Sequence, residues 1–342
     1  MKIGKQTYVL KNTPTIQECA CIVGPKEGNG PMQKYFDKIM QDVILDEASF
    51  EKAESKFVSE TISTLLSKSN LKPEDIDIAS GGDLLNQCIA SNYALRKLSI
   101  PFLGLYGACS TYVEGLIVNS LLVNAGYAQK MINVSSSHYC SAERQFRLPL
   151  EQGGQKAPTS QWTVTGSGAA LITQKAEPPY ITHVTIGKVI DYGITDVTNM
   201  GAAMAPAAVD TILTHLYDTG RDVNYYDLII TGDLGVLGSE ILVDLCKNND
   251  VDLSSIHNDC GKLIFHEEDN DVKSGASGCA CCATIFSGYF FKELKNKNIN
   301  KILLVATGAL MSPVSTLQGE SIPSIAHAIS IENNIGEDIW KY

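Results

Sequence analysis

The sequence predicts an α/β fold built from two similar halves. Apolar residues recur at helical spacing over 48–68, and short apolar runs at 76–80 and 130–135 are typical of buried strands. Helical and strand-like segments alternate along the chain, which favours an α/β arrangement. The order of segments in the first half returns in the second, and 342 residues are many for a single core.

The first half is expected to alternate helices with short strands. Residues 48–68 form the first clear helix, because Phe50, Phe57, Val58, Ile62, Leu65 and Leu66 recur on one face. The elements expected after it are a strand at 76–80, a glycine break, a helix over 85–97, a strand-like run at 100–106, a helix at 110–125 closed by Gly126, and a strand at 130–135.

Two pairs of segments support the duplication. DIASGGD at 77–83 and DLIITGD at 227–233 both begin with Asp, end with Gly-Asp and follow a helical segment. The segments beginning at Gly107 and Gly278 both run through an apolar helix to a lysine and then enter a strand. Because two such matches occur in the same order, we expect two related α/β halves packed as one body.

The predicted division falls between residues 175 and 176. Residues 1–175 form an N-terminal half that contains Cys109 and a loop insertion, and residues 176–342 form the C-terminal half. The segments 143–163 and 190–206 lack clear periodicity and are predicted to be loops that can act as lids. HEEDND at 266–271 is expected to be a solvated acidic turn.

Composition excludes several classes of protein. The net charge of −11 and the absence of a basic cluster disfavour nucleic-acid binding. The longest apolar runs are shorter than a membrane span, and MKIGKQTYVL lacks the apolar core of a signal peptide, so a protein kept inside the cell is expected. The ten cysteines do not supply the two CxxC pairs typical of a zinc site, which predicts reduced core thiols and neither a zinc site nor a cofactor.

Three glycine-containing motifs resemble those of a known superfamily. GACST at 107–111, followed by a helix, resembles the nucleophile segment of thiolases and β-ketoacyl synthase III, while VTGSGAALI at 164–172 and SGASG at 274–278 are similar to that superfamily's glycine-rich strand and GASG segment. GGDLLNQ, GACST and SSSHYCSAERQFR carry a closer resemblance to the stage V sporulation protein AD (SpoVAD) family of spore-forming bacteria. The resemblance covers about residues 15–330.

The resemblance implies a fold, a ligand and a location. The fold is thiolase-like, with duplicated βαβαβ halves in a five-layer α-β-α-β-α body. The family is implicated in handling dipicolinic acid, so dipicolinic acid or its calcium chelate is the expected ligand. Other SpoVA membrane proteins are the expected partners, at the spore or forespore inner membrane, with this chain as a peripheral component. A homodimer is expected by analogy with thiolases.

Cys109 is predicted to lie just before a helix whose first turn is Ser110-Thr111-Tyr112. Unpaired N–H groups and the dipole at a helix start lower a thiol pKa or hold an anion, so the position suits a nucleophile or a carboxylate site. An acyl-transfer enzyme also needs a base or oxyanion partner facing the thiol. The resemblance places those partners at 230–233, at 272–276 and near Ala306, where the sequence has no His, Asn or Cys.

The remaining polar residues predict an anion pocket. Arginine suits carboxylates, and dipicolinic acid carries two. Each of these residues also has a plainer interpretation: His138 is alternatively a structural histidine, and the two arginines are alternatively surface charges. Asp83 either accepts a hydrogen bond, contacts a calcium ion, or shapes a Gly-Asp turn as its counterpart Asp233 would. The residues predicted to bind ligand are Cys109, His138, Arg144, Arg147, Asp83, Ser110, Thr111 and Ser136.

Three functions follow from these observations. The first is a non-catalytic thiolase-like protein that binds dipicolinic acid for uptake into or release from spores. The second is an acyl-transfer enzyme that uses Cys109 as nucleophile and His138 as base. The third is a structural scaffold whose pocket no longer binds a ligand.

Overall fold

Two five-stranded sheets of identical topology form the centre of the molecule. A computed structural model describes residues 1–146, 156–174, 177–336 and 339. If the strands of each half are numbered along the chain, both sheets have the spatial order 3-2-4-5-1. The N-terminal sheet consists of β3 (Thr15–Val23), β5 (Ile78–Gly82), β6 (Phe102–Gly104), β7 (Lys130–Ser137) and β9 (Gly166–Thr173). The C-terminal sheet consists of β10 (Tyr180–Thr185), β11 (Leu228–Thr231), β12 (His257–Asp259), β14 (Lys301–Ala309) and β15 (Ser324–Glu332).

The two sheets are joined along β3 and β10, which pair at Thr15 and Tyr180. Within each sheet, strands 2, 3 and 4 are parallel, while strand 5 runs antiparallel to its neighbours. The change from one set of strands to the other falls between the end of β9 and the start of β10. Short strands lie outside this plan: β1 (Lys2–Ile3), β2 (Thr7–Val9), β4 (Lys38–Ile39), β8 (Trp162–Thr163) and β13 (Ala276–Ser277).

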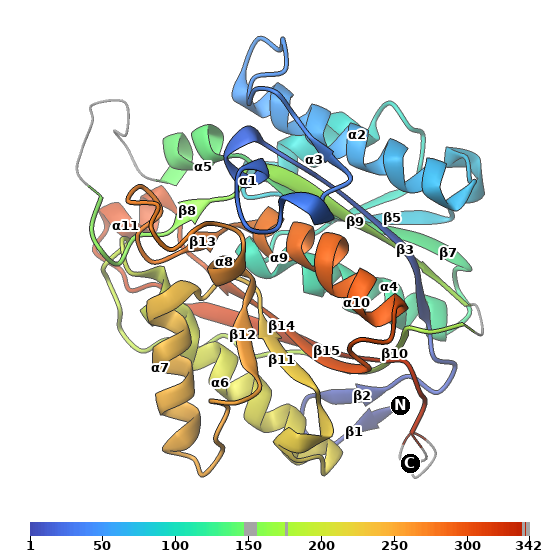
Figure 1. The fold of residues 1–342 in the computed structure, drawn as a ribbon, viewed down its shortest axis with the longest axis vertical. Helices are drawn as coiled ribbons and strands as arrows, with labels where there is room; N and C mark the ends of the chain where they lie inside the picture. The colour runs from blue at the N-terminus through green and yellow to red at the C-terminus, as the bar shows by residue number, and fades with distance from the viewer. Residues whose placement is uncertain (147–155, 175–176, 337–338, 340–342) are drawn as a thin grey trace.

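The two sheets alternate with three layers of helices, which gives the molecule five layers (Figure 1). The layer on the N-terminal sheet contains α2 (Phe50–Ser69) and α3 (Ile89–Leu95), and the layer on the C-terminal sheet contains α6 (Met200–Thr219) and α7 (Gly235–Lys247). Between the sheets lie α4 (Thr111–Asn124), α9 (Cys279–Ile285) and α10 (Phe291–Lys295). The smaller helices are α1 (Pro25–Gly28), α5 (Tyr139–Phe146), α8 (Cys260–Leu263) and α11 (Pro313–Leu317). The predicted α/β class, with two related halves in five layers, is therefore confirmed.

The sequence explains why α2 and α4 differ. Helix α2 is an outer helix, capped by Ser49, whose hydroxyl accepts from the Lys52 N–H, and closed by Asn70 at a φ of 53°. Its core face includes Phe57, which is fully buried. Helix α4 lies between two sheets, and its buried residues therefore surround most of its circumference: Thr111, Tyr112, Val113, Gly115, Leu116, Ile117, Asn119, Ser120 and Val123.

Glycines of the 164–172 motif allow close packing. A Cβ on Gly168 would come within 2.3 Å of the Ala283 carbonyl oxygen. Strand β9 therefore approaches the backbone of α9 more closely than any other residue would permit. This contact holds α9, and with it the Gly278 peptide at its start, against the N-terminal sheet.

Several predicted boundaries need correction. The loop predicted over 143–163 begins inside α5, and residues 147–155 lie outside the described part of the chain. The loop predicted over 190–206 ends at the start of α6, so residues 200–206 are helical. The thiols are free, as expected, with Cys19 and Cys21 in β3 and Cys279, Cys281 and Cys282 in α9. Within the described residues, no helix combines the length and apolar character that crossing a bilayer requires.

Candidate functional site

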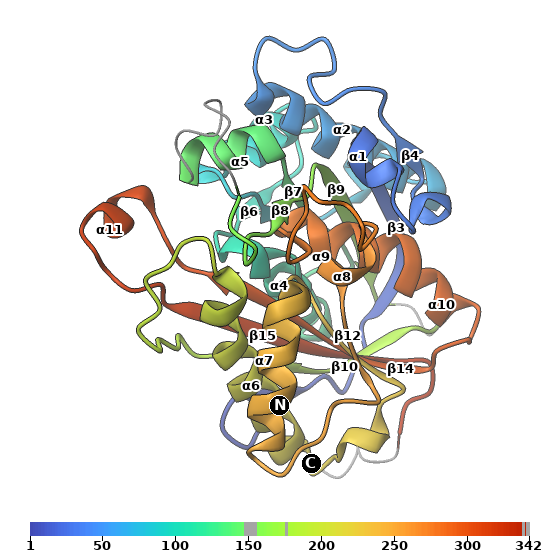
Figure 2. The ribbon, with the colours of Figure 1, turned by 60° about the vertical axis from the view of Figure 1, so that its left-hand side comes forward.

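A cavity of about 370 Å³ opens between the two halves, and Cys109 lies in its wall. The N-terminal half contributes Leu84, Tyr106 and Phe146, and the C-terminal half contributes Met200 and Met311. Its other lining residues are Ala108, Ala142, Glu143, Thr163, Ser277, Ala309, Leu310, Ser312 and Ser315. Figure 2 shows α5 and the projecting α11, which border this cavity, on the same side of the molecule. We call it the Cys109 pocket.

A strained turn places Cys109 in that wall. Ala108 has a φ of 52°, in the left-handed region that non-glycine residues rarely adopt. The Ser110 hydroxyl donates to the Gly107 carbonyl at 2.6 Å, and the Thr111 hydroxyl donates to the Ala108 carbonyl at 2.7 Å. These hydroxyls hold the turn, and neither Ser110 nor Thr111 is among the described lining residues. Their predicted contact with ligand stays a prediction.

The Cys109 thiol faces the carboxyl group of Asp233. Burial raises the pKa of the thiol well above its usual value, and the nearby Asp233 and Cys279 raise it further. The thiol donates a hydrogen bond to the Asp233 carboxylate, which also favours the protonated thiol, while the Gly278 N–H acts in the opposite direction. The prediction that the helix start lowers this pKa is therefore wrong, because burial and a facing carboxylate outweigh the helix dipole.

Asp233 is held by both its carboxyl oxygens. One accepts from the Thr307 hydroxyl at 2.8 Å, and the other accepts from the Gly278 N–H at 3.2 Å. Burial raises the pKa of Asp233 to about 7, against the hydrogen bonds from Cys109, Thr307 and Gly278. Asp233 thus crosses from the end of β11 to the N-terminal half, and it does more than shape the Gly-Asp turn that the sequence suggested.

Two histidines of the C-terminal half, His257 and His327, have partners other than Cys109. His257 Nε2 lies 2.9 Å from the Thr231 hydroxyl, and His327 Nδ1 accepts from the Gly187 N–H at 3.1 Å. No imidazole is among the interactions described for the Cys109 thiol or among the described lining residues of its pocket. The group facing the sulfur from the C-terminal half is therefore a carboxyl.

Asp83 and Ser136 belong to a buried polar cluster rather than to the described pocket wall. Asp83 accepts from the Leu85 N–H at 2.9 Å and from the Ser91 N–H and hydroxyl at 2.8 and 2.7 Å. This confirms the interpretation that Asp83 shapes the turn after its strand. The Ser136 hydroxyl donates to Glu54 at 2.9 Å. Burial raises the pKa of Glu54 to about 8, and Asp83 adds to the effect.

His138 and Arg144 also lie outside the described wall of the Cys109 pocket. His138 Nε2 lies 2.7 Å from the Val43 carbonyl, Nδ1 accepts from the Cys140 N–H, and burial lowers the pKa of the ring. This is the structural histidine that the sequence offered as the alternative. Arg144 forms an ion pair with Glu51 and borders a separate surface depression. Arg147 lies outside the described residues, so its ligand role stays a prediction.

Helix α5 borders the Cys109 pocket with a face other than the one that carries the predicted Arg144. Ala142, Glu143 and Phe146 of α5 line the Cys109 pocket, whereas the neighbouring Arg144 points to the Glu51 side. Successive helical residues are separated by about 100° around the axis, so a shift of one position changes the neighbours of a side chain. The spacing of Ala142 and Phe146, four residues apart, was the signal that could have identified the lining face.

The described pocket wall is mostly apolar. It contains the Glu143 side chain, and it contains no Lys, Arg or His among the described residues. Within the same part of the chain, no group of three or more His, Cys, Asp or Glu side chains is arranged to hold a metal ion. A ligand of this pocket is therefore expected to present an apolar or aromatic face and to tolerate a nearby carboxylate.

Comparison with known proteins assigns the family. A sequence model described as stage V sporulation protein AD (SpoVAD) matches residues 4–332. Stage V sporulation protein AD of Bacillus subtilis (strain 168) is 45% identical over 329 residues, which cover 96% of this chain and 97% of that protein. The chain belongs to the SpoVAD family.

Solved structures similar to this SpoVAD-family chain share its fold. The 3-oxoacyl-(acyl carrier protein) synthase III from Pseudomonas aeruginosa PAO1 aligns over 94% of this chain and 98% of that one, with a TM-score of 0.56 and 10% identity. OleA from Xanthomonas campestris, in a variant form, aligns over 96% of this chain and 100% of that one, with a TM-score of 0.55 and 14% identity. At such identities the likeness shows a common fold, and it leaves the chemistry to be argued from the pocket of the SpoVAD-family chain itself.

Proposed function

We propose that this SpoVAD-family protein binds dipicolinic acid, as its calcium chelate, in the Cys109 pocket without covalent catalysis. The observation that carries the proposal is the Asp233 carboxyl group facing the Cys109 thiol, which lies in the wall of the cavity between the two halves. A nucleophilic cysteine needs a neighbouring group that stabilises its thiolate, such as an imidazolium or another cation. A carboxylate there does the opposite, so the geometry disfavours the acyl-transfer alternative.

The charge of the pocket favours the chelate over the free dianion. Glu143 lines the pocket, Asp233 lies behind Cys109, and the described lining residues include no cation, so a bare dicarboxylate would find no oppositely charged group among them. Calcium takes six to eight oxygen ligands, and dipicolinate supplies two carboxylates and a ring nitrogen, which leaves coordination positions for a protein carboxylate. The apolar side chains of Leu84, Phe146 and Met200 would contact the flat ring.

Membership of the family supports a proposal for the cellular role. The protein would hold this ligand during sporulation or germination, for uptake into or release from spores, in a complex with other SpoVA membrane proteins. We propose a peripheral position at the inner membrane of the spore or forespore. We also propose a homodimer, for which the outer strand β6, with Leu103 42% exposed, offers an edge to a second copy.

A calorimetric titration tests the ligand. We expect dipicolinate to bind the full chain more tightly with calcium than without it, and Glu143→Gln to weaken the chelate at least tenfold, because a charged contact in a dry pocket contributes about 1.5–3 kcal/mol. Glu240→Gln, at an exposed position of α7, is the matched control and should leave affinity unchanged.

The titration also separates the alternatives. Absence of heat with either form of the ligand would favour a structural scaffold. Tighter binding of calcium-free dipicolinate, lost on replacing Arg144, would return the site to the arginine side of α5 that the sequence suggested. Unchanged affinity in the Glu143 variant would contradict the placement of the chelate in the Cys109 pocket.

A further inference from the structure

A second depression lies between α2 and α3, and it shares no described lining residue with the Cys109 pocket. It has a volume of about 440 Å³. Figures 1 and 2 show α2 and α3 side by side on the outer face of the N-terminal half. We call it the basic groove, because four of its lining side chains are cations: Lys52, Lys56, Arg96 and Lys97.

The four cations come from two segments of the chain. Lys52 and Lys56 lie four residues apart on α2, and therefore on one face of that helix. Arg96 and Lys97 follow directly after α3. The Arg96 guanidinium lies over the Tyr93 ring, 4.4 Å from its centroid, so an aromatic side chain fixes its position. Four like charges around one groove repel one another, which favours an anion between them.

The acidic residues of the groove do not neutralise it. Glu60 pairs with Lys38, outside the groove lining, at 2.9 Å, and Glu47 reaches Lys56 only at 4.0 Å. No ion pair is described for Lys52, Arg96 or Lys97 in the residues that the structure covers. The groove therefore carries a local excess of positive charge on a chain whose net charge is −11.

From this arrangement we infer that the basic groove binds a phosphate-bearing anion. Phosphate carries a charge of about −1.5 to −2 near neutral pH, which matches four cations opposed by two carboxylates. Lysine ammonium groups act as point-charge partners of phosphate, and the arginine fork suits it as well. The same group occurs in free phosphorylated compounds and in anionic lipid headgroups, so the chemistry of recognition is shared by both sources.

Titration of inorganic pyrophosphate into the full chain tests the groove directly. The double variant Lys52→Gln/Arg96→Gln should weaken pyrophosphate binding at least tenfold. The matched control Lys247→Gln/Lys297→Gln, with the same change in net charge at exposed positions elsewhere, should change it less than twofold. Cys109→Ala should leave it unchanged, which makes this test independent of the function proposed for the Cys109 pocket.

Vesicles identify the source of the phosphate. Sedimentation with phosphatidylglycerol vesicles, but not with phosphatidylcholine vesicles, and its loss in the double variant would assign the groove to a lipid headgroup. Pyrophosphate binding without vesicle binding would assign it to a free phosphorylated compound. Absence of binding to both probes, or an equal loss in the control pair, would overturn the inference.

Discussion

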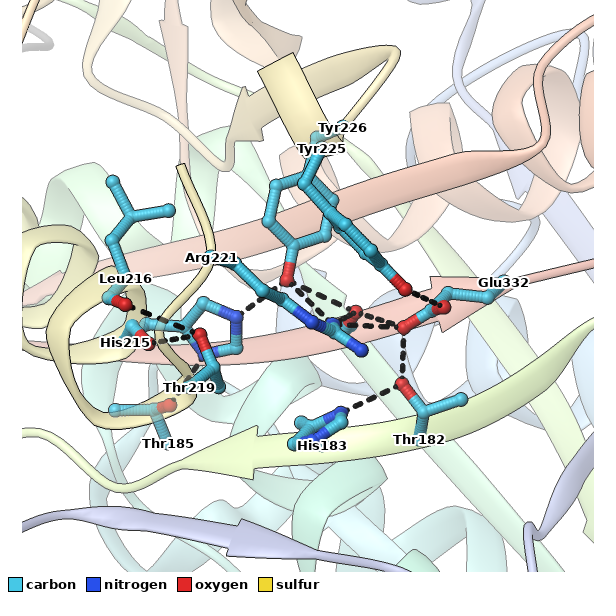
Figure 3. A network of polar contacts seen from close by, with 11 residues as sticks. Thr182, His183, Thr185, His215, Leu216, Thr219, Arg221, Tyr225, Tyr226 and Glu332 are labelled. Carbon is cyan, nitrogen blue, oxygen red and sulfur yellow. Dashed lines mark hydrogen bonds and ion pairs between the residues drawn. The ribbon is translucent and has the colours of Figure 1, made fainter. Parts of the chain in front are cut away.

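Replacing Glu332 with glutamine is expected to lower the free energy of unfolding by about 3–5 kcal/mol, because it leaves a buried guanidinium without its counter-charge. Arg221 Nη1 lies 2.9 Å from Glu332 Oε1, and the two side chains are 3% and 0% exposed. The same nitrogen donates to the Tyr226 and Ser330 hydroxyls at 3.0 Å each. Figure 3 shows this network, which connects the end of α6 with β10 and β15.

Chemical denaturation measures this effect, with a surface pair as control. Lys188 and Asp210 are 2.8 Å apart, but the Lys188 side chain is 56% exposed, so Lys188→Met should cost less than about 1 kcal/mol. Combining Arg221→Met with Glu332→Gln should cost less than the sum of the single changes, since the two residues act as a pair. A cost for Glu332→Gln as small as that of the surface control would contradict the structural role of the network.

The second large effect is a pH dependence of stability that Asp233 controls. Its pKa is about 7 in the folded chain and 3.8 for an ordinary aspartate. An acid whose pKa is raised by folding contributes stability below its unfolded pKa, and that contribution is lost as the pH rises through the folded pKa. Between about pH 5 and 8, the wild-type chain should therefore lose about 3 kcal/mol more than Asp233→Asn.

Unfolding curves recorded across this pH range test the prediction. Asp250→Asn is a suitable control, because Asp250 is exposed and its φ of 60° is one that asparagine tolerates. It should keep the full pH dependence of the wild type. Parallel curves for wild type and Asp233→Asn would mean that Asp233 does not titrate as its burial implies.

Local patterns in the sequence predicted most of the fold. Helical spacing located α2, and the segments that begin with Gly located α4 and α9. These helices could be predicted because the apolar pattern of a helix depends only on residues close together in the sequence. The paired motifs predicted the repeat of strand order in the two sheets. The boundaries of the two predicted loops were wrong, since the start of α6 at Met200 and the end of α5 at Phe146 depend on tertiary packing.

The site was harder to predict than the fold, because it forms where segments from both halves meet. The sequence identified Cys109 and the position of its facing residue at 230–233, but it could not show that Asp233 turns toward the thiol. That direction depends on contacts with Thr307 and Gly278, which are distant along the chain. The polar residues after β7 were assigned to a ligand, whereas His138 bonds to backbone and Arg144 to Glu51.

The most direct test of a non-covalent pocket is mass spectrometry of Cys109 after incubation of the full chain with an acyl-CoA. Because the thiol is buried, protonated and faces a carboxylate, we expect no acyl adduct on Cys109 and no release of coenzyme A above that of Cys109→Ala. A stable adduct on Cys109 with continued turnover would contradict the account and make this SpoVAD-family protein an acyl-transfer enzyme.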